Sequence, residues 1–124
     1  MQNLIDLEKK INSELTSKIN KTQIKHNQIY LDTDKEDLLD IVLFLKTNPD
    51  TKFRQLIDIT VVDHPENNQR FEVVYLFLSH EFNQRLILKY TIAENELIPS
   101  ITSIFPGANW MEREVFDMYG VSFK

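Results

Sequence analysis

The 124-residue sequence contains no cysteine and only two glycines, Gly107 and Gly120. The lack of cysteine excludes disulfides, thiolate metal ligands, cysteine nucleophiles and cysteine-bound iron–sulfur clusters from these residues. With so few glycines, neither a phosphate-binding loop nor a dinucleotide-binding fingerprint is present. No apolar run approaches the roughly 18 residues that span a bilayer. The net charge is −5 and no dense Lys/Arg cluster occurs. We therefore expect no cofactor, no metal site and no binding of nucleic acid.

The pattern of apolar residues predicts a single α+β domain over residues 1–124. Helical spacing predicts a helix over about 3–15 and a second helix that Thr33 or Asp34 can cap and that ends at the Asn48-Pro49 pair. Alternating or continuous apolar patterns predict strands at 19–25, 28–32, 53–62, 71–78 and 84–92, with a tight turn at His26-Asn27 between the first two. The segment 71–78 is apolar at nearly every position, which predicts an interior strand of a covered sheet. We expect helices to cover a mixed or largely antiparallel sheet.

The carboxyl-terminal residues predict a helical turn over 98–105 and a well-bounded helix over about 110–119. Asn109 and Glu112 have the spacing of a capping box, and Gly120 occupies the position of a left-handed helix end. A helical wheel assigns four of its residues to the core side: Met111, Val115, Met118 and Tyr119. Trp110 and Phe116 leave that side, so the two aromatic rings are either exposed on an isolated chain or covered by other helices of the same domain.

Glu112 projects close to the apolar side of this helix, where an ionised carboxylate needs a partner. Three partners remain open: the Asn109 amide of the capping box, a distant arginine, or another protein. The candidate arginines are Arg54, Arg70 and Arg85. Glu114 points about 200° away from Glu112 on the wheel, which argues against a paired acid and base. Arg113 and Asp117 are four residues apart and are expected to pair.

Two strand carboxylates, Glu72 and Asp58, also need a partner if they are ionised in an apolar environment. Each lies within an otherwise apolar strand. We expect such a residue to lie at a sheet edge or to be held by a buried arginine.

Three segments are arranged in an order and spacing typical of one known family. Residues 112–123 contain Glu-Arg-Glu, then Asp, two bulky apolar or aromatic residues, Gly, a branched apolar residue and Phe. Residues 70–75 are Arg-Phe-Glu-Val-Val-Tyr, with Leu78-Ser79 after them, and a weaker segment spans 53–65. Together they resemble the C (30-kDa) subunit of respiratory complex I, the NADH:quinone oxidoreductase.

The resemblance implies a non-catalytic structural subunit in the peripheral arm, within the quinone module of a proton-translocating enzyme. Electrons would pass from NADH to quinone through neighbouring subunits, with no active site and no cofactor on this chain. The implied partners are the hydrogenase-like quinone-site subunit and the adjacent iron–sulfur subunit, and membrane association would be indirect. The implied location is the cytoplasmic face of a bacterial inner membrane, or the matrix face in mitochondria.

The resemblance also implies which residues contact the partner subunits. The signature would supply the contacts: Glu112, Arg113, Glu114, Asp117, Tyr119, Gly120 and Phe123. The sheet would support the helix through Phe71, Glu72, Tyr75, Asp58 and Asp63. The family continues past the signature with a Gly-His-Pro segment, paired arginines and a long tail. We therefore expect the sequence ending at Lys124 to lack the contacts that this tail makes.

Two other functions remain open on the residues alone. A small autonomous hydrolase would use Glu112 or Glu114 with His64, and these side chains would have to meet within about 3 Å of one point. A binding module unrelated to respiration would fail to recover hydrogenase-like and iron–sulfur subunits in a pulldown.

Overall fold

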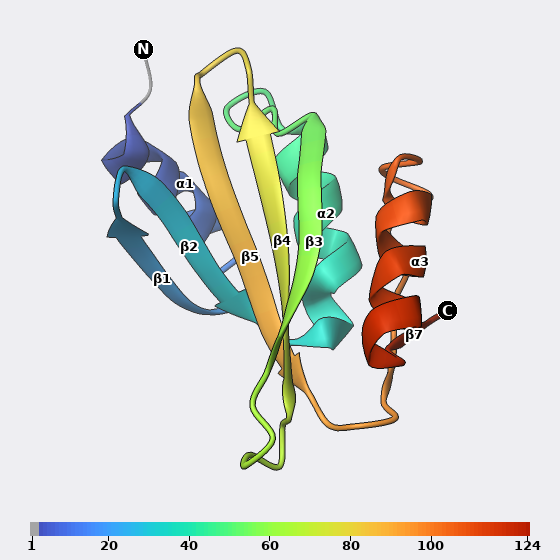
Figure 1. Cartoon of the computed structure of the whole chain (residues 1–124). Helices are drawn as coiled ribbons and strands as arrows, with labels where there is room; N and C mark the ends of the chain where they lie inside the picture. Colours follow the sequence, from blue (N-terminus) through green and yellow to red (C-terminus); the bar gives the residue numbers. More distant parts are fainter. Residues whose placement is uncertain (1–2) are drawn as a thin grey trace.

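A five-stranded mixed sheet forms the centre of the computed structural model, which describes residues 3–124 (Figure 1). The strands are β1 (Ile19–Lys25), β2 (Gln28–Thr33), β3 (Gln55–Asp63), β4 (Phe71–Ser79) and β5 (Gln84–Ile92). They stand in the order β1-β2-β5-β4-β3. The β2–β5 pair is parallel and the other neighbours are antiparallel. The predicted α+β class with a mixed, mostly antiparallel sheet is confirmed.

Three helices pack around this sheet: α1 (Leu4–Glu14), α2 (Leu38–Thr47) and α3 (Ala108–Tyr119). In Figure 1, α1 and α2 lie behind the sheet and α3 stands beside β3. A short 3₁₀ turn, Lys35–Asp37, precedes α2, so the expected side-chain cap from Asp34 does not form. No helix of the described residues is long and apolar enough to cross a membrane.

The core lies between the sheet and the helices. Alternate side chains of the interior strands β4 and β5 are buried in it: Phe71, Val73, Tyr75 and Phe77 from β4, and Leu86, Leu88, Tyr90 and Ile92 from β5. The other face of β4 is only half-buried, and Val74 and Leu76 lie in a shallow hollow there. The prediction that β4 is an interior strand is correct, but the described helices leave this second face uncovered.

A tight turn at His26-Asn27 joins β1 to β2, as the sequence predicts. Both residues adopt a left-handed backbone, with φ angles of 52° and 60°. Positive φ at both central positions is typical of the two-residue hairpin turn whose twist matches that of the strands.

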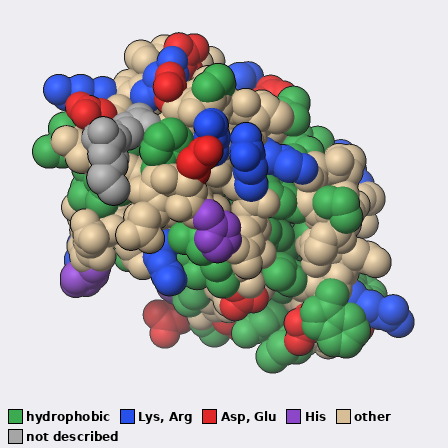
Figure 2. Space-filling view, turned by 90° about the horizontal axis from the view of Figure 1, so that it is seen from above, with side chains coloured by type: hydrophobic (Ala, Val, Ile, Leu, Met, Phe, Trp, Pro, Cys, Tyr) green, Lys and Arg blue, Asp and Glu red, His purple; other side chains and the backbone are tan. Residues whose placement is uncertain are grey.

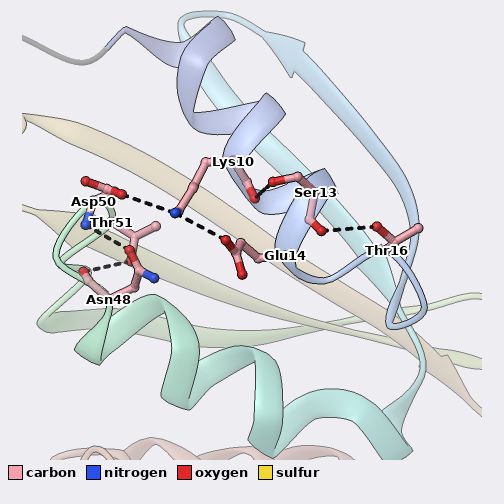
Figure 3. A network of polar contacts seen from close by, with 7 residues as sticks. All are labelled: Lys10, Ser13, Glu14, Thr16, Asn48, Asp50 and Thr51. Atoms are coloured by element: carbon pink, nitrogen blue, oxygen red, sulfur yellow. Dashed lines mark hydrogen bonds and ion pairs between the residues drawn. The ribbon is translucent and has the colours of Figure 1, made fainter.

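Ion pairs join the elements at one end of the sheet. Lys10 of α1 lies between Glu14 and Asp50, with both Nζ–O distances at 3.3 Å, and so ties α1 to the loop after α2 (Figure 3). Lys52 and Glu81 join that loop to the β4–β5 turn at 2.6 Å. Figure 2 looks onto this end and shows Lys and Arg side chains beside Asp and Glu side chains. Because these groups are exposed, each pair adds little to stability.

The helical turn predicted over 98–105 forms only in its second part, where the Ile104 and Phe105 N–H groups donate to the Ile101 carbonyl at 3.0 and 2.8 Å. The segment between β5 and α3 differs from the prediction at its start. It begins with the short strand β6 (Leu97–Ile98), which pairs in parallel with β7 (Ser122–Phe123) after the last helix. The Lys124 N–H also donates to the Ile98 carbonyl at 2.9 Å. The residues on either side of α3 are therefore joined by backbone hydrogen bonds.

Candidate docking surface on the carboxyl-terminal helix

Helix α3 carries the signature residues and begins two positions earlier than predicted. Gly107 is its N-cap residue, and no side chain makes a capping hydrogen bond. Asn109 already lies inside the helix, so the predicted capping box with Glu112 is wrong. The predicted end is confirmed, since Gly120 has a φ of 72° and its N–H donates to the Phe116 carbonyl at 2.8 Å.

Glu112 is buried, with only 6% of its surface exposed, and both carboxylate oxygens accept hydrogen bonds. The Ser100 hydroxyl donates to Oε1 at 2.7 Å, and the Ile101 backbone N–H donates to Oε2 at 2.8 Å. Ser100 itself is held by Thr102, whose hydroxyl lies 2.9 Å from the Ser100 hydroxyl. Neither the Asn109 amide nor a distant arginine is the partner of this carboxylate.

This carboxylate therefore holds the segment before α3 against the helix. Hydrogen bonds to an ionised group are stronger than neutral ones, and they are worth most where water is excluded. The same charge acts on the buried Tyr75–Tyr90 pair, whose hydroxyl oxygens lie 2.8 Å apart. Burial is the main cause that raises the pKa of Tyr75, and the negative charge of Glu112 raises this pKa further. The role of Glu112 inside this chain is structural.

Three large side chains of α3 are exposed. The exposed fractions are 68% for Trp110, 52% for Phe116 and 72% for Met118. Of the two alternatives for Trp110 and Phe116, exposure is correct, whereas the assignment of Met118 to the core is wrong. Val115 is buried, and Met111 and Tyr119 pack against the core as predicted. Exposed aromatic residues next to an arginine are typical of binding hot spots.

On one side of these residues lies an open hollow of about 590 Å³. Phe116, Phe123 and two cations, Arg113 and Lys124, line it. Within the described part of the chain, Arg113 makes no ion pair, so the predicted pair with Asp117 does not form. The guanidinium group is exposed and free to bind a carboxylate of another molecule.

On the other side of α3 lies a groove of about 220 Å³ against strand β3. Glu114 and Met118 of the helix line it together with Asp58 and its neighbours on the strand. The hollow on one side of α3 therefore carries the cations Arg113 and Lys124, and the groove on the other side carries the carboxylates of Asp58 and Glu114. Such an arrangement suits the recognition of a partner with complementary charge.

Two of the predicted supporting residues make defined contacts: Phe71 with helix α3, and Asp63 with Arg70 where β3 ends and β4 begins. The Phe71 ring meets the Tyr119 ring edge-on, with centroids 6.1 Å apart. Asp63 accepts two hydrogen bonds from the Arg70 guanidinium, at 2.8 and 3.0 Å, and this contact lowers the pKa of Asp63.

The two strand carboxylates have different surroundings. Glu72 lies on the half-buried face of β4, 3.7 Å from Lys89 and 3.9 Å from His64, so the expected buried arginine is absent. Asp58 is exposed on the edge strand β3, and its Oδ1 accepts the Ile59 N–H at 2.9 Å. The edge alternative is therefore correct for Asp58 and wrong for Glu72.

The hydrolase alternative lacks the arrangement that it requires. Glu112 and Glu114 line different hollows, and His64 lines neither of them. Both Glu112 oxygens already accept hydrogen bonds from Ser100 and Ile101. Within residues 3–124, no group of three or more His, Asp or Glu side chains is placed to hold a metal ion.

Sequence reasoning missed the role of Ser100 and Thr102. Each is a small hydroxyl residue in a segment without clear periodicity, and neither stands at a capping position relative to Glu112. The link between Ser100 and Glu112 spans 12 positions and depends on the path of the chain. No local pattern in the sequence could have indicated it.

Comparison with known proteins identifies the family. Residues 31–124 match the family described as respiratory-chain NADH dehydrogenase, 30 Kd subunit. A relative from Dinoroseobacter shibae, the NADH-quinone oxidoreductase subunit designated C, is 47% identical over 102 residues, covering 82% of this chain and 47% of the relative. The same subunit of Azorhizobium caulinodans is 37% identical over 122 residues, covering 98% of this chain and 58% of the relative.

A solved structure shares the fold. It is that of the membrane-bound sulfane sulfur reductase, an archaeal respiratory membrane complex, with a TM-score of 0.85 and 22% identity. The alignment covers 97% of this chain and 69% of that one. This chain spans about half the length of several curated relatives that it matches. The chain belongs to the family of the 30 Kd subunit of respiratory-chain NADH dehydrogenase, which is the C (30-kDa) subunit of NADH-quinone oxidoreductase.

Proposed function

We propose that this chain is a non-catalytic structural subunit in the peripheral arm of NADH-quinone oxidoreductase, within its quinone module. Other subunits would carry electrons from NADH to quinone, and this chain would support their arrangement. Membership of the family and the names of the curated relatives support this assignment. Membrane association would be indirect, through the complex, at the cytoplasmic face of a bacterial inner membrane.

One observation carries the proposal. In helix α3 the buried Glu112 carboxylate binds groups of this chain, whereas the large side chains of Trp110, Phe116 and Met118 are exposed. Both oxygens of Glu112 accept hydrogen bonds from the chain itself, so this carboxylate holds the segment before α3 in place. Trp110, Phe116 and Met118 lie outside the core. An exposed cluster of large apolar side chains is unusual on a monomer, whereas an interface between subunits is enriched in these residue types.

The proposed partners are the hydrogenase-like quinone-site subunit and the adjacent iron–sulfur subunit. Arg113 is the most direct choice for contact, because it is exposed and makes no ion pair within the described residues. Glu114 and Asp117 flank it on the exposed side of the helix, and Tyr119 and Phe123 lie half-buried at the helix end.

Substitution of Arg113 tests this proposal. Arg113→Ala should lower recovery of the two partner subunits in a pulldown by at least about fivefold, the loss typical of an interface arginine. The melting temperature should stay within a few degrees, because the residue is exposed. Arg85→Ala removes another exposed arginine, from the open sheet face, and serves as the matched control.

Several outcomes would contradict the proposal. Equal recovery with Arg113→Ala and Arg85→Ala would mean that the helix is not a contact surface. Unfolding of the Arg113→Ala chain would assign this arginine to internal pairing. Recovery of proteins without the hydrogenase-like and iron–sulfur subunits would favour a binding module unrelated to respiration, and turnover of a substrate by the purified chain would make it an enzyme.

A further inference from the structure

The groove between β3 and α3 follows the free backbone edge of the sheet. Strand β3 is the last strand on its side and pairs only with β4. Asp58 and Thr60 point to the open face of the sheet, whereas Ile59 and Val61 point to the core, and all four line the groove. Because side chains from both faces of β3 line the groove, the groove lies along the backbone of this strand. An edge strand has unpaired N–H and C=O groups there.

The edge remains available along most of β3. Its register shifts between Leu56 and Asp58, an irregularity that disturbs pairing only near the start of the strand. From Asp58 to Asp63 the pairing with β4 is regular. This length is close to that of a typical strand, so it offers a template for a further strand, although the Ile59 N–H already donates to Asp58 Oδ1 at 2.9 Å.

The walls of the groove combine apolar and acidic side chains. Met118 supplies an exposed thioether at one wall, and Val115 and Tyr119 extend the apolar lining. Asp58 and Glu114 supply two carboxylates, both exposed. Within residues 3–124, neither of these carboxylates forms an ion pair. The groove therefore offers two carboxylates that have no cationic partner in the described chain, although Asp58 Oδ1 accepts the Ile59 N–H.

We propose that an extended segment of a partner subunit, with alternating apolar and basic residues, adds to the sheet at the β3 edge. Its backbone would pair with Asp58–Asp63, its apolar side chains would pack toward Met118, and its Lys or Arg side chains would meet Asp58 and Glu114. Addition of a strand to an exposed sheet edge is an established mode of peptide recognition. The inference rests on the proposed docking function and names the chemistry of one bound segment.

A second copy of this chain is a poorer occupant. Pairing of two β3 edges would bring the exposed Asp58 and Glu114 carboxylates of both copies toward one another. Like charges placed opposite each other destabilise an interface. The net charge of −5 adds to this repulsion.

A defined peptide tests the inference on the intact chain. The probe is a capped synthetic peptide of about six residues, a typical strand length, that alternates lysine and valine. Its binding is followed by NMR of the isotope-labelled protein. The largest amide shifts should occur in Asp58–Val61 and Glu114–Tyr119. Amide hydrogen exchange at the outer edge of β3 should slow, because these N–H groups gain partners.

Charge variants make the test specific. Asp58→Asn and Glu114→Gln should each weaken binding of the lysine–valine peptide about threefold, the effect of one exposed ion pair. Asp6→Asn removes the same charge from an exposed position of α1 outside the groove, and its affinity should match that of the unchanged chain. A peptide with glutamate in place of lysine should not bind, and added salt should weaken the lysine–valine peptide.

Four results would overturn the inference. Two concern affinity: no binding at millimolar peptide, or equal binding of the glutamate peptide. Two concern location: amide shifts confined to the open sheet face or to the Arg113 hollow, or dimerisation of the chain through β3. Failure here is distinct from failure of the proposed function. The peptide experiment uses the isolated chain, whereas Arg113→Ala is judged by recovery of whole partner subunits.

Discussion

Replacement of Glu112 by alanine should destabilise the chain strongly, although it also removes the cost of burying a charge. The carboxylate accepts two hydrogen bonds, from the Ser100 hydroxyl and from the Ile101 N–H. Ile101 is fully buried, so in the variant its N–H would lose its partner without gaining water. Hydrogen bonds to charged groups contribute about 1.5–3 kcal/mol each, and removal also relieves the cost of burying the charge. We expect the free energy of unfolding to fall by about 3 kcal/mol.

Urea unfolding followed by circular dichroism measures this change. With a slope of about 1.5–2 kcal/mol per M, typical of small proteins, the midpoint should fall by about 1.5–2 M. Glu114→Ala is the matched control, because this residue is exposed on the same helix. Its free energy of unfolding should stay within about 0.5 kcal/mol of the unchanged chain.

A double-mutant cycle separates the hydrogen bond from the lost volume. Glu112→Gln keeps the shape of the side chain, and Ser100→Ala removes one donor. The two substitutions together should cost less than the sum of the single effects by about 1 kcal/mol, because both remove the same bond. Equal midpoints for Glu112→Ala and Glu114→Ala, or a cycle without coupling, would refute the bracing role of Glu112.

Three further predictions concern other contacts. Tyr75→Phe should cost about 1–2 kcal/mol in urea unfolding by leaving the buried Tyr90 hydroxyl without its partner at 2.8 Å; adding Tyr90→Phe should cost little more, and a full second loss would contradict the pairing. The hydrogen bonds from Arg70 hold the pKa of Asp63 below its ordinary value of 3.8. Because a lowered carboxyl pKa stabilises above the unfolded value, this contribution should be lost as the pH falls below about 4. Arg70→Gln should therefore flatten the acid side of a stability–pH curve, and an unchanged curve would refute this. Gly120→Ala should cost about 1 kcal/mol in thermal unfolding, because Gly120 has a φ of 72°; no loss would mean that the helix end rearranges.

Most of the fold could be predicted from local patterns. The strand over 84–92 matches β5, because its alternation reflects one buried and one exposed face. The turn at His26-Asn27 was also predictable, because short polar residues between two extended segments favour a hairpin. In these regions the local preference and the tertiary environment agree.

The second face of β4 could not be predicted correctly from its composition. Val74 and Leu76 are apolar, yet they lie on a face that the described helices leave uncovered and are half-buried. The sequence indicates that both faces of the strand avoid water to some degree. It does not indicate whether a helix of the same chain or another molecule provides the cover.

For the candidate site, the sequence indicated which aromatic residues leave the core side of the helix but not which residues contact Glu112. The exposure of Trp110 and Phe116 follows from helical periodicity, which is a local property. The partners of Glu112 come from a segment whose path depends on the pairing of β6 with β7. Met118 lies beside the core stripe on the wheel but is 72% exposed, because α3 packs beside the edge strand and leaves a groove there.

The central claim is that the exposed side of α3 is a docking surface for other subunits. Hydroxyl-radical footprinting of the assembled complex and of the isolated chain tests it most directly, with the oxidation rates of Trp110, Phe116 and Met118 as the readout. We predict that all three side chains react readily in the isolated chain, where they are 68%, 52% and 72% exposed. In the complex, their rates should fall severalfold. Unchanged rates at these residues, in a complex that protects other surfaces of the chain, would contradict the claim.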